Sequence, residues 1–342
     1  MASRRRTVAD AGEARLIAMI RRAVERSRLG DVASLGDDAA ILPNPRGRGR
    51  QVVTTDVLVE GTHWRESHLT PTALGRRALV VNLSDIAAMA ARPLWFTLGL
   101  GMPPQQSLDW FRGLLRGLLR AGDQFGCPLV GGDLVRSPVA MISITVCGQA
   151  VGKRLCRRDA ARVGDGVWVT GDLGRARLAL EFLESKRPER DCPAGVLARH
   201  RSPTPRLPEA AALAKAGVVH AMMDVSDGLQ SDLGWISRLS HVGARVDLDM
   251  LPLRSGVRRA IESQGQSAGP FAAASGEEFE LLFTSNAEET AIRQALTRAG
   301  LRTPVTRIGE IISATTRGGG VQFRREGRAV KSPPDSGFAH FS

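Results

Sequence analysis

Residues 78–89 read Ala-Leu-Val-Val-Asn-Leu-Ser-Asp-Ile-Ala-Ala-Met. The apolar residues predict the inner part of a helix over 71–90, for which Thr70 is the N-cap. Ser84 and Asp85 are unexpected in it, because their side chains compete for backbone hydrogen bonds and disfavour helix interiors. They either cap a kink or present a hydroxyl and a carboxylate to a site. The stretch alone leaves both interpretations open.

Five more short acidic stretches lie on either side of this one. They are Gly36-Asp37-Asp38, Thr54-Thr55-Asp56 with Glu60, Gly131-Gly132-Asp133, Asp224-Val225-Ser226-Asp227-Gly228 with Asp232, and Gly276-Glu277-Glu278-Phe279-Glu280. Most follow an apolar run at an expected strand end or helix start, where ligands gather in α/β folds. Mg²⁺ prefers oxygen ligands and usually takes one or two carboxylates together with substrate phosphates. The pattern therefore predicts several Mg²⁺ ions that bridge a compound with several phosphates.

Each stretch also has a purely structural interpretation. Asp37-Asp38 and Gly131–Asp133 fit tight turns, Asp224 to Gly228 fits a helix N-cap, and Glu277 to Glu280 fits a solvated face. The joint occurrence of all six stretches, in a chain with 35 Asp and Glu, favours a site over six unrelated structural features.

The composition is that of a globular protein of about two domains, with 342 residues, 43% hydrophobic and 24% charged. A net charge of +12 raises nucleic acid or a membrane surface as partners. However, Arg outnumbers Lys heavily, aromatic residues make up only 4%, and no nucleic-acid-binding motif is present. We therefore expect neither a nucleic-acid nor a membrane partner.

Several other classes of protein are excluded by motif. No apolar run reaches the roughly 18 residues of a membrane span, and acidic residues stand where a signal peptide needs apolar ones. Cys127, Cys147, Cys156 and Cys192 lack zinc-site spacing, which fits a reducing cytoplasm. The phosphate-binding lysine loop and the protein-kinase signatures are both missing. An enzyme built from these residues would handle phosphates through metal ions and glycine amides.

The remaining periodicities predict an α/β chain. The expected helices are 11–28, 71–90, 108–125, 174–183 and 229–239, and the expected strands are 51–55, 94–100, 128–130, 139–151, 167–170, 218–225 and 245–248. Turn residues and charges over 157–166 favour a domain boundary near 150 to 165. We expect an N-terminal arm and helix over 1–28, one domain over 29–152 and a second over 153–342.

The ordered motifs resemble the thiamine-monophosphate kinase family of the aminoimidazole-ribonucleotide-synthetase (PurM-like) superfamily. The acidic motifs carry the superfamily resemblance, and Gly61-Thr62-His63-Trp64 with Glu277-Glu278-Phe279-Glu280-Leu281-Leu282-Phe283 narrows it to the kinase. The resemblance covers about residue 30 to the C-terminus. It implies a two-domain PurM-like fold, an N-terminal sheet paired across a homodimer, and transfer of the ATP γ-phosphoryl group to thiamine phosphate.

The resemblance also implies roles for particular residues. The implied metal ligands are Asp38, Thr54, Thr55, Asp56, Asp85, Asp133, Asp224 and Asp227, of which Asp56, Asp85 and Asp133 are the catalytic set. The implied ATP contacts are Gly132, Asp133, Arg157 and Ser226, and the implied thiamine phosphate contacts are His63, Glu277 and Phe338. Surface exposure of His63, a role for Arg158 in place of Arg157, and core docking of Phe338 remain alternatives.

The chain departs from the family at one motif. The usual Gly-Glu-Asp-Tyr-Glu is replaced by Gly276-Glu277-Glu278-Phe279-Glu280, which lengthens one carboxylate and removes one hydroxyl. If those groups touch the substrate, its affinity would change. Alternative functions are therefore another ATP-using PurM-like enzyme, such as a purine-pathway synthetase, or a relative that binds thiamine phosphate and ATP without turnover. A selenophosphate-forming enzyme needs a reactive Cys near the N-terminus, whereas the first Cys here is Cys127.

Overall fold

The computed structural model describes residues 13–25, 37–43, 49–151, 155–185, 187–314 and 320–333. Gly36 and Phe338 lie outside the described residues, so the expected contact of Phe338 with the substrate falls outside them as well. The expected N-terminal helix is present as α2 (Glu13–Glu25).

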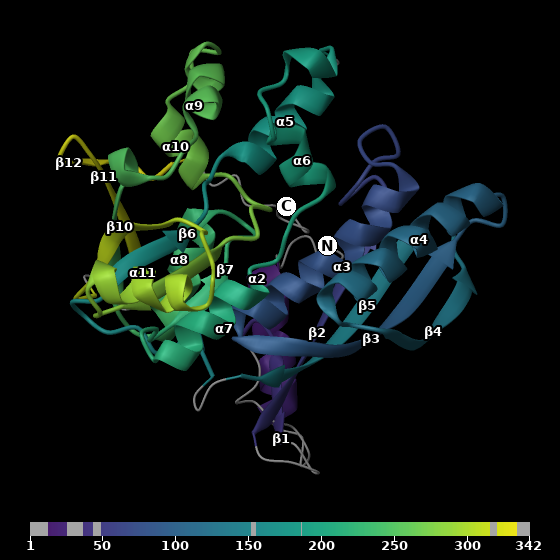
Figure 1. The fold of residues 1–342 in the computed structure, drawn as a ribbon, viewed down its shortest axis with the longest axis horizontal. Helices are drawn as coiled ribbons and strands as arrows, with labels where there is room; N and C mark the ends of the chain where they lie inside the picture. Colours follow the sequence, from purple (N-terminus) through teal and green to yellow (C-terminus); the bar gives the residue numbers. More distant parts are fainter. Residues whose placement is uncertain are drawn as a thin grey trace, which may run out of the picture.

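The N-terminal half is a five-stranded sheet with α3 (Pro71–Ala88) and α4 (Leu108–Phe125) packed on one face (Figure 1). The strand order is β1-β2-β5-β3-β4, with β1 Ala40–Pro43, β2 Arg50–Val59, β3 Ala91–Met102, β4 Leu129–Arg136 and β5 Met141–Ala150. Only β3 and β4 run parallel; the other neighbouring strands are antiparallel.

The C-terminal half is a seven-stranded sheet in the order β12-β11-β8-β10-β6-β9-β7. The strands are β6 Gly166–Thr170, β7 Met222–Asp224, β8 Gly243–Asp247, β9 Leu281–Ser285, β10 Val305–Ile312, β11 Gly320–Arg325 and β12 Arg328–Val330. The helices are α5 Arg175–Glu184, α6 Val196–Arg201, α7 Leu207–Ala216, α8 Leu229–Leu239, α9 Ser255–Glu262, α10 Ala268–Ala273 and α11 Glu289–Arg298, with short 3₁₀ turns at Glu189–Asp191 and Leu248–Met250.

Helix α3 joins the two halves. Leu79, Leu83 and Ile86 pack into the core of the N-terminal sheet. Ala87 instead belongs to a second apolar cluster with Met222 and other residues of the C-terminal half. Because α3 is covered by protein on both sides, its polar residues must find partners within the protein.

Local sequence accounts for the start and the close packing of α3. The Thr70 side chain accepts a hydrogen bond from the amide of Ala73 at 3.2 Å, which makes Thr70 the N-cap. A Cβ at Gly75 would lie 2.1 Å from the carbonyl oxygen of Leu114, and one at Gly117 would lie 2.0 Å from that of Thr72. These glycines therefore allow the backbones of α3 and α4 to approach each other directly.

The expected elements are present, but β2 ends at Val59 rather than at residue 55, β4 ends at Arg136 rather than at residue 130, and β7 begins at Met222 rather than at residue 218. The helices α9 to α11 and the strands β9 to β12 were not expected.

Three local interpretations are wrong. Helix α3 runs unbroken through Ser84 and Asp85, so they do not cap a kink. Gly131–Asp133 lies inside strand β4 and is not a tight turn. Glu278 and Glu280 are fully buried, so their motif is not a solvated face.

No helix among the described residues combines the length and the apolar character needed to cross a membrane.

We predict that Gly117→Ala lowers the free energy of unfolding by about 1–3 kcal/mol, because the new methyl group would press the carbonyl of Thr72 away from α4. Gly234→Ala in α8 is the matched control, since nothing lies within 4 Å of its added Cβ. The control should be neutral or more stable by up to about 1 kcal/mol. Urea unfolding measures both, and equal effects of the two substitutions would contradict the packing described for α3 and α4.

Candidate functional site

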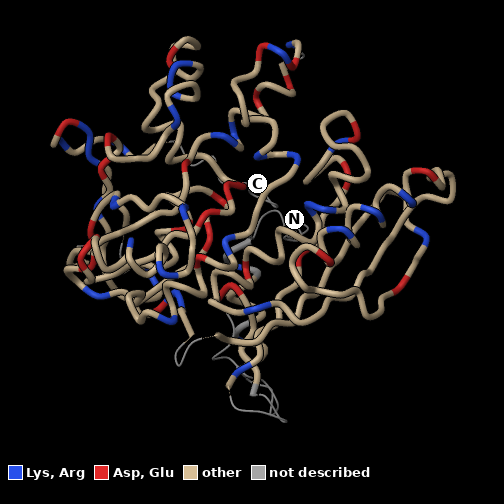
Figure 2. The backbone as a smooth tube through the Cα atoms, in the orientation of Figure 1, with Lys and Arg blue, Asp and Glu red and all other residues tan. Residues whose placement is uncertain are grey.

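Three carboxylates from distant parts of the chain meet where the two halves touch. Asp38 lies just before β1, Asp85 in the last turns of α3 and Asp224 at the end of β7, and one oxygen of each lies within 4.8 Å of the others. We call these residues the carboxylate cluster. Figure 2 shows acidic segments in this central region, beside basic segments that lie both there and on the outer loops.

Hydroxyl groups hold the cluster in place. The Thr54 hydroxyl donates to Asp85 at 2.6 Å, and the Ser84 hydroxyl donates to Asp224 at 2.5 Å. Asp56 lies beside the cluster on β2, with its amide donating to the side chain of Asn82 at 3.0 Å. Helix α3 therefore positions acids from both halves through Asn82, Ser84 and Asp85.

The electrostatics of the cluster are unfavourable without a cation. Burial and then the neighbouring Asp38 raise the pKa of Asp224 to about 7. Burial and then the charges of Asp56, Asp224 and Asp38 raise the pKa of Asp85 well above its usual value. Burial and Asp227 raise the pKa of Asp56 to about 6. At neutral pH these groups repel one another, and a bound positive charge would relieve that repulsion.

The residues present fit a hard divalent cation. Their donor atoms are carboxylate and hydroxyl oxygens, the set that Mg²⁺ prefers. Within the described part of the chain, Oδ1 of Asp224 is buried without a hydrogen-bond partner, which leaves an oxygen free to bind an ion. Among the described residues, Asp38, Asp85 and Asp224 are the three acidic side chains that lie close enough together to hold such an ion.

Of the two neighbouring arginines, Arg158 rather than Arg157 reaches the cluster. Arg158 pairs with Asp38 through both oxygens, at 3.0 Å for Nε. Arg157 pairs with Asp159 at 2.8 Å and lies 3.6 Å from Asp37. The sequence favoured Arg157 as the phosphate contact, and both guanidinium groups lie at the same edge of the site.

The loop after β7 brings Ser226 and Asp227 to the same region. Asp232, which is fully buried in the first turn of α8, accepts hydrogen bonds from the amides of residues 226, 227 and 228 at 3.1–3.3 Å. Because the N-cap residue of α8, Gly228, has no side chain to accept these amides, the Asp232 carboxylate accepts them instead and fixes the loop. This arrangement leaves Asp227 exposed at the end of the loop.

His63 and Glu277 form a second polar group nearby. The amide of Val59 donates to Nδ1 of His63 at 3.0 Å. Glu277 is half-buried; its loss of water would raise its pKa, but Arg77, His200 and His63 outweigh that cost and lower the pKa. Glu277 is therefore a carboxylate at neutral pH.

The two unusual residues of this motif are buried in the protein. Glu278 is buried and accepts from the Ala176 amide at 3.0 Å and the Ser275 hydroxyl at 2.7 Å. Phe279 is 4% exposed. The departures from the family pattern therefore fall on side chains that contact protein interior.

Two of the sequence-derived metal ligands lie apart from the cluster within one chain. Thr55 is exposed on the opposite face of β2 from Thr54 and Asp56. Its hydroxyl donates to the carbonyl oxygen of Ile144 at 3.1 Å. Asp133 is exposed on β4, next to Gly132, and pairs in register with Gly99 of β3. Since β5 and β3 separate β4 from β2, Asp133 is about 14 Å from the Asp56 strand.

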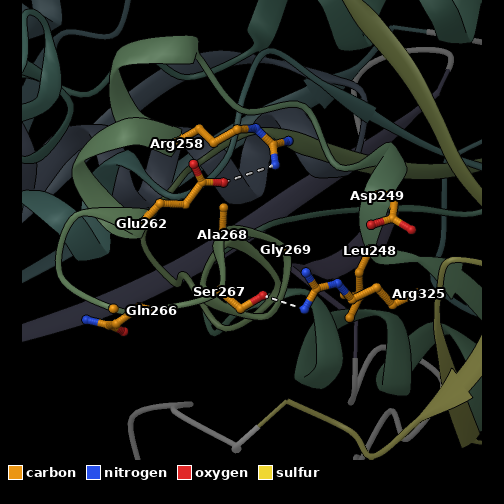
Figure 3. Close-up of a pocket in the computed structure, with 10 residues that line it drawn as sticks. Leu248, Asp249, Arg258, Glu262, Gln266, Ser267, Ala268, Gly269 and Arg325 are labelled. Atoms are coloured by element: carbon orange, nitrogen blue, oxygen red, sulfur yellow. Dashed lines mark hydrogen bonds and ion pairs between the residues drawn. The ribbon is translucent and has the colours of Figure 1, made fainter.

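A separate cavity of about 380 Å³ lies on the C-terminal half (Figure 3). Arg258, Glu262, Asp249 and Arg325 line it, and Arg325 donates to Ser267 at 2.9 Å. None of the sequence-derived site residues lines this cavity. Its acids and arginines neutralise each other, so nothing in it selects a ligand charge.

Comparison with known protein families shows which class of protein this chain belongs to. Residues 36–153 match the family model described as AIR synthase related protein, N-terminal domain, and residues 162–320 match its C-terminal domain counterpart. The two matched domains correspond to the N-terminal and C-terminal halves of the fold.

The more specific likeness is to one branch of that class. A thiamine-monophosphate kinase of Synechococcus elongatus is 38% identical over 90% of this chain and 91% of its own, and one of Escherichia coli is 34% identical over 97% and 98%. The chain belongs to the thiamine-monophosphate kinase family. The expected resemblance and the two-domain PurM-like fold are therefore confirmed.

Solved structures agree. One described as AaThiL complexed with AMPPCP and TMP has a TM-score of 0.84 and 30% identity, covering 99% of this chain and 100% of that chain. A thiamine-monophosphate kinase from Stenotrophomonas maltophilia has a TM-score of 0.73 and 35% identity, covering 92% and 96%. Hydrogenase maturation protein HypE, at 21% identity and a TM-score of 0.64, shares the fold.

We predict that, with divalent cations removed, the stability of the protein relative to Asp224→Asn falls as pH rises from about 4 to about 8. Folding raises the pKa of Asp224 from 3.8 to about 7, so the folded state binds the extra proton in this window and loses it as pH rises. The expected change is on the order of 2–4 kcal/mol. Chemical unfolding across pH measures it.

Adding Mg²⁺ should remove most of this pH dependence, because the cation stabilises the ionised form of the cluster. A stability difference between wild type and Asp224→Asn that stays constant with pH would contradict the electrostatics described for the cluster.

Proposed function

We propose that the protein transfers the γ-phosphoryl group of ATP to thiamine phosphate, giving thiamine diphosphate and ADP. The carboxylate cluster carries the proposal, because it supplies the cation-binding oxygens that a phosphotransferase without a lysine loop requires. The kinase relatives match nearly the whole chain, and one related structure is described as a complex with AMPPCP and TMP.

Phosphoryl transfer between two anions mainly requires positioning and neutralisation of charge. Asp38, Asp85 and Asp224 would hold Mg²⁺, with Asp56, Asp227 and the Thr54 hydroxyl beside them. When bound, Mg²⁺ would neutralise phosphate charge as a Lewis acid. Thr54 and Ser84 fix the carboxylate orientations through the hydrogen bonds described above. The acceptor is already an anionic phosphate oxygen, so no side chain has to remove a proton.

The two substrates would be held side by side at the cluster, because the amide of Glu277 donates to the carbonyl of Ser226 at 2.7 Å. Ser226, Arg157, Gly132 and Asp133 are the proposed ATP contacts. His63, Glu277 and Phe338 are the proposed contacts of thiamine phosphate, whose planar ring is partly cationic. Glu277 suits this ring because its carboxylate stays ionised.

A second copy of the chain would complete the site. Strand β4 is a sheet edge with Val130, Leu134 and Val135 exposed by 59%, 59% and 48%. Such an apolar edge favours pairing with another strand. Asp133 lies on this edge, far from the cluster of its own chain, so in a homodimer it would join the cluster of the partner. Thr55 lies on the sheet face opposite to Thr54, which α3 and α4 leave uncovered. The second copy would also bring Thr55 close to a metal site.

The domain boundary and the location of the protein in the cell are also proposals. We propose that the domains divide near residues 152 and 153, with the N-terminal one carrying most metal ligands. We also propose a cytoplasmic location, which the free thiols of Cys127, Cys147, Cys156 and Cys192 favour.

We predict that purified protein with ATP, Mg²⁺ and thiamine phosphate forms thiamine diphosphate, detected by chromatography. Asp85→Asn should lower kcat by at least about 100-fold, because it removes a charge that binds the cation. Asp109→Asn is the matched control, since Asp109 is exposed on α4 and pairs only with Arg112 among the interactions described. A wild-type protein that binds ATP but forms no product would refute the kinase proposal.

Complementation tests the role of the second copy. A purified heterodimer of one Asp133→Asn chain and one Asp224→Asn chain should have about half the wild-type activity, because one of its two sites would be intact. Each homodimeric variant should be nearly inactive. An inactive heterodimer would mean that Asp133 acts within its own chain, and a fully active Asp133→Asn homodimer would mean that Asp133 has no role in the site.

A further inference from the structure

Arg77 is a buried cation that crosses from the N-terminal half to the C-terminal half. It lies on α3 and is 1% exposed. One guanidinium nitrogen donates to the carbonyl oxygen of His200 at 2.7 Å, and another donates to Oε1 of Glu277. The guanidinium also lies 5.6 Å from the ring centre of Phe279. All three contacts are made to the C-terminal half.

The backbone that Arg77 reaches is strained. Glu277 and Phe279 both have positive φ, at 58° and 51°, which residues with a side chain rarely adopt. Two amides anchor this segment to the loop after β7: Glu277 donates to the carbonyl of Ser226 at 2.7 Å, and Phe279 donates to that of Val225 at 2.9 Å. The Glu277 side chain is nevertheless 43% exposed. Among the described ion pairs, Arg77 is the residue that binds one of its carboxylate oxygens.

Arg77 and Ser84 are seven residues apart on α3, which places them on one face about two turns apart. Arg77 binds the Glu277 carboxylate and Ser84 binds that of Asp224. One helix face therefore fixes the residue proposed to contact the acceptor and a residue proposed to bind the cation.

We propose that Arg77 is the positioning residue of the acceptor site: it fixes Glu277 as an oriented anion whose second oxygen faces the partly cationic ring of thiamine phosphate. This inference rests on the proposed function. Arg77 acts through Glu277 and touches no reacting atom. It selects an acceptor that brings a cation or a hydrogen-bond donor, since a carboxylate accepts hydrogen bonds and donates none.

A purely structural role for Arg77 predicts a different outcome. Loss of a buried arginine would then lower the free energy of unfolding and kcat, and it would change KM for ATP and KM for thiamine phosphate alike. A positioning role predicts a change confined to the acceptor, because Ser84, Thr54 and the carboxylate cluster keep their own hydrogen bonds.

The test is steady-state kinetics of Arg77→Met and Arg77→Lys. We expect Arg77→Met to raise KM for thiamine phosphate roughly 10- to 100-fold, the range for losing a hydrogen bond to a charged group, with KM for ATP within about twofold. Arg77→Lys keeps the charge but not the fork, so it should recover part of the loss. Equal changes in KM for both substrates would overturn the proposal.

Arg76→Met is the matched control. Arg76 is the neighbour on α3, but it donates to Gln124 at 2.6 Å and lies over Phe125, away from Glu277. Its substitution should leave KM for thiamine phosphate within about twofold of wild type.

A double-mutant cycle decides whether Arg77 acts through Glu277. In a Glu277→Gln background, Arg77→Met should add less than about twofold to KM, because the carboxylate it orients is gone. Full multiplication of the two effects would overturn the proposal. If Arg77→Met does not fold, as judged by thermal unfolding, the cycle is run with Arg77→Lys.

Calorimetric binding separates this inference from the proposed function. If wild type binds thiamine phosphate without forming product, phosphoryl transfer is refuted, and the same cycle measured on Kd still decides the role of Arg77. If wild type does not bind thiamine phosphate, both proposals fail.

Discussion

Asp38, Asp85 and Asp224 repel one another, and the site is built around this repulsion; Asp38 and Asp224 are buried and Asp85 is half-buried. Gathering carboxylates away from water is unfavourable, which is why the pKa of Asp224 is raised to about 7. Hydroxyl donors and Arg158 reduce the cost without removing it. A site of this kind is complete when a cation occupies it, and its partner molecules are then anions such as phosphates.

Helix α3 explains how the fold tolerates the repulsion. It is covered by both halves and packed directly on α4 through Gly75 and Gly117. From this one helix, Arg77 binds Glu277, Ser84 binds Asp224, and Asp85 is itself part of the cluster. The acids of the two halves therefore keep a fixed relation to one another, which transfer between two bound phosphates requires.

Local patterns predicted the acidic motifs and most elements up to residue 248, but they predicted no element beyond it and did not predict which motifs meet. Thr54 and Thr55 are the same residue type and both fit the metal pattern, yet the alternation of side chains along β2 places them on opposite faces of the sheet. Asp133 fits the metal pattern, while the strand order puts it at the far edge of the sheet. Arg77 was missed because its partner, Glu277, is 200 residues away, and nothing local distinguishes it from the other arginines. The polar residue Ser84 within an apolar helix was the one local signal in the sequence that α3 contributes to a site.

Anomalous diffraction from crystals grown with Mn²⁺ and a non-hydrolysable ATP analogue would locate the bound cation, because Mn²⁺ takes the same oxygen ligands as Mg²⁺. We expect a peak bound by oxygens of Asp38, Asp85 and Asp224, with the analogue's phosphates against it. Analogue bound with no metal peak at these carboxylates, or with its metal held elsewhere, would contradict the claim that this cluster is the cation site.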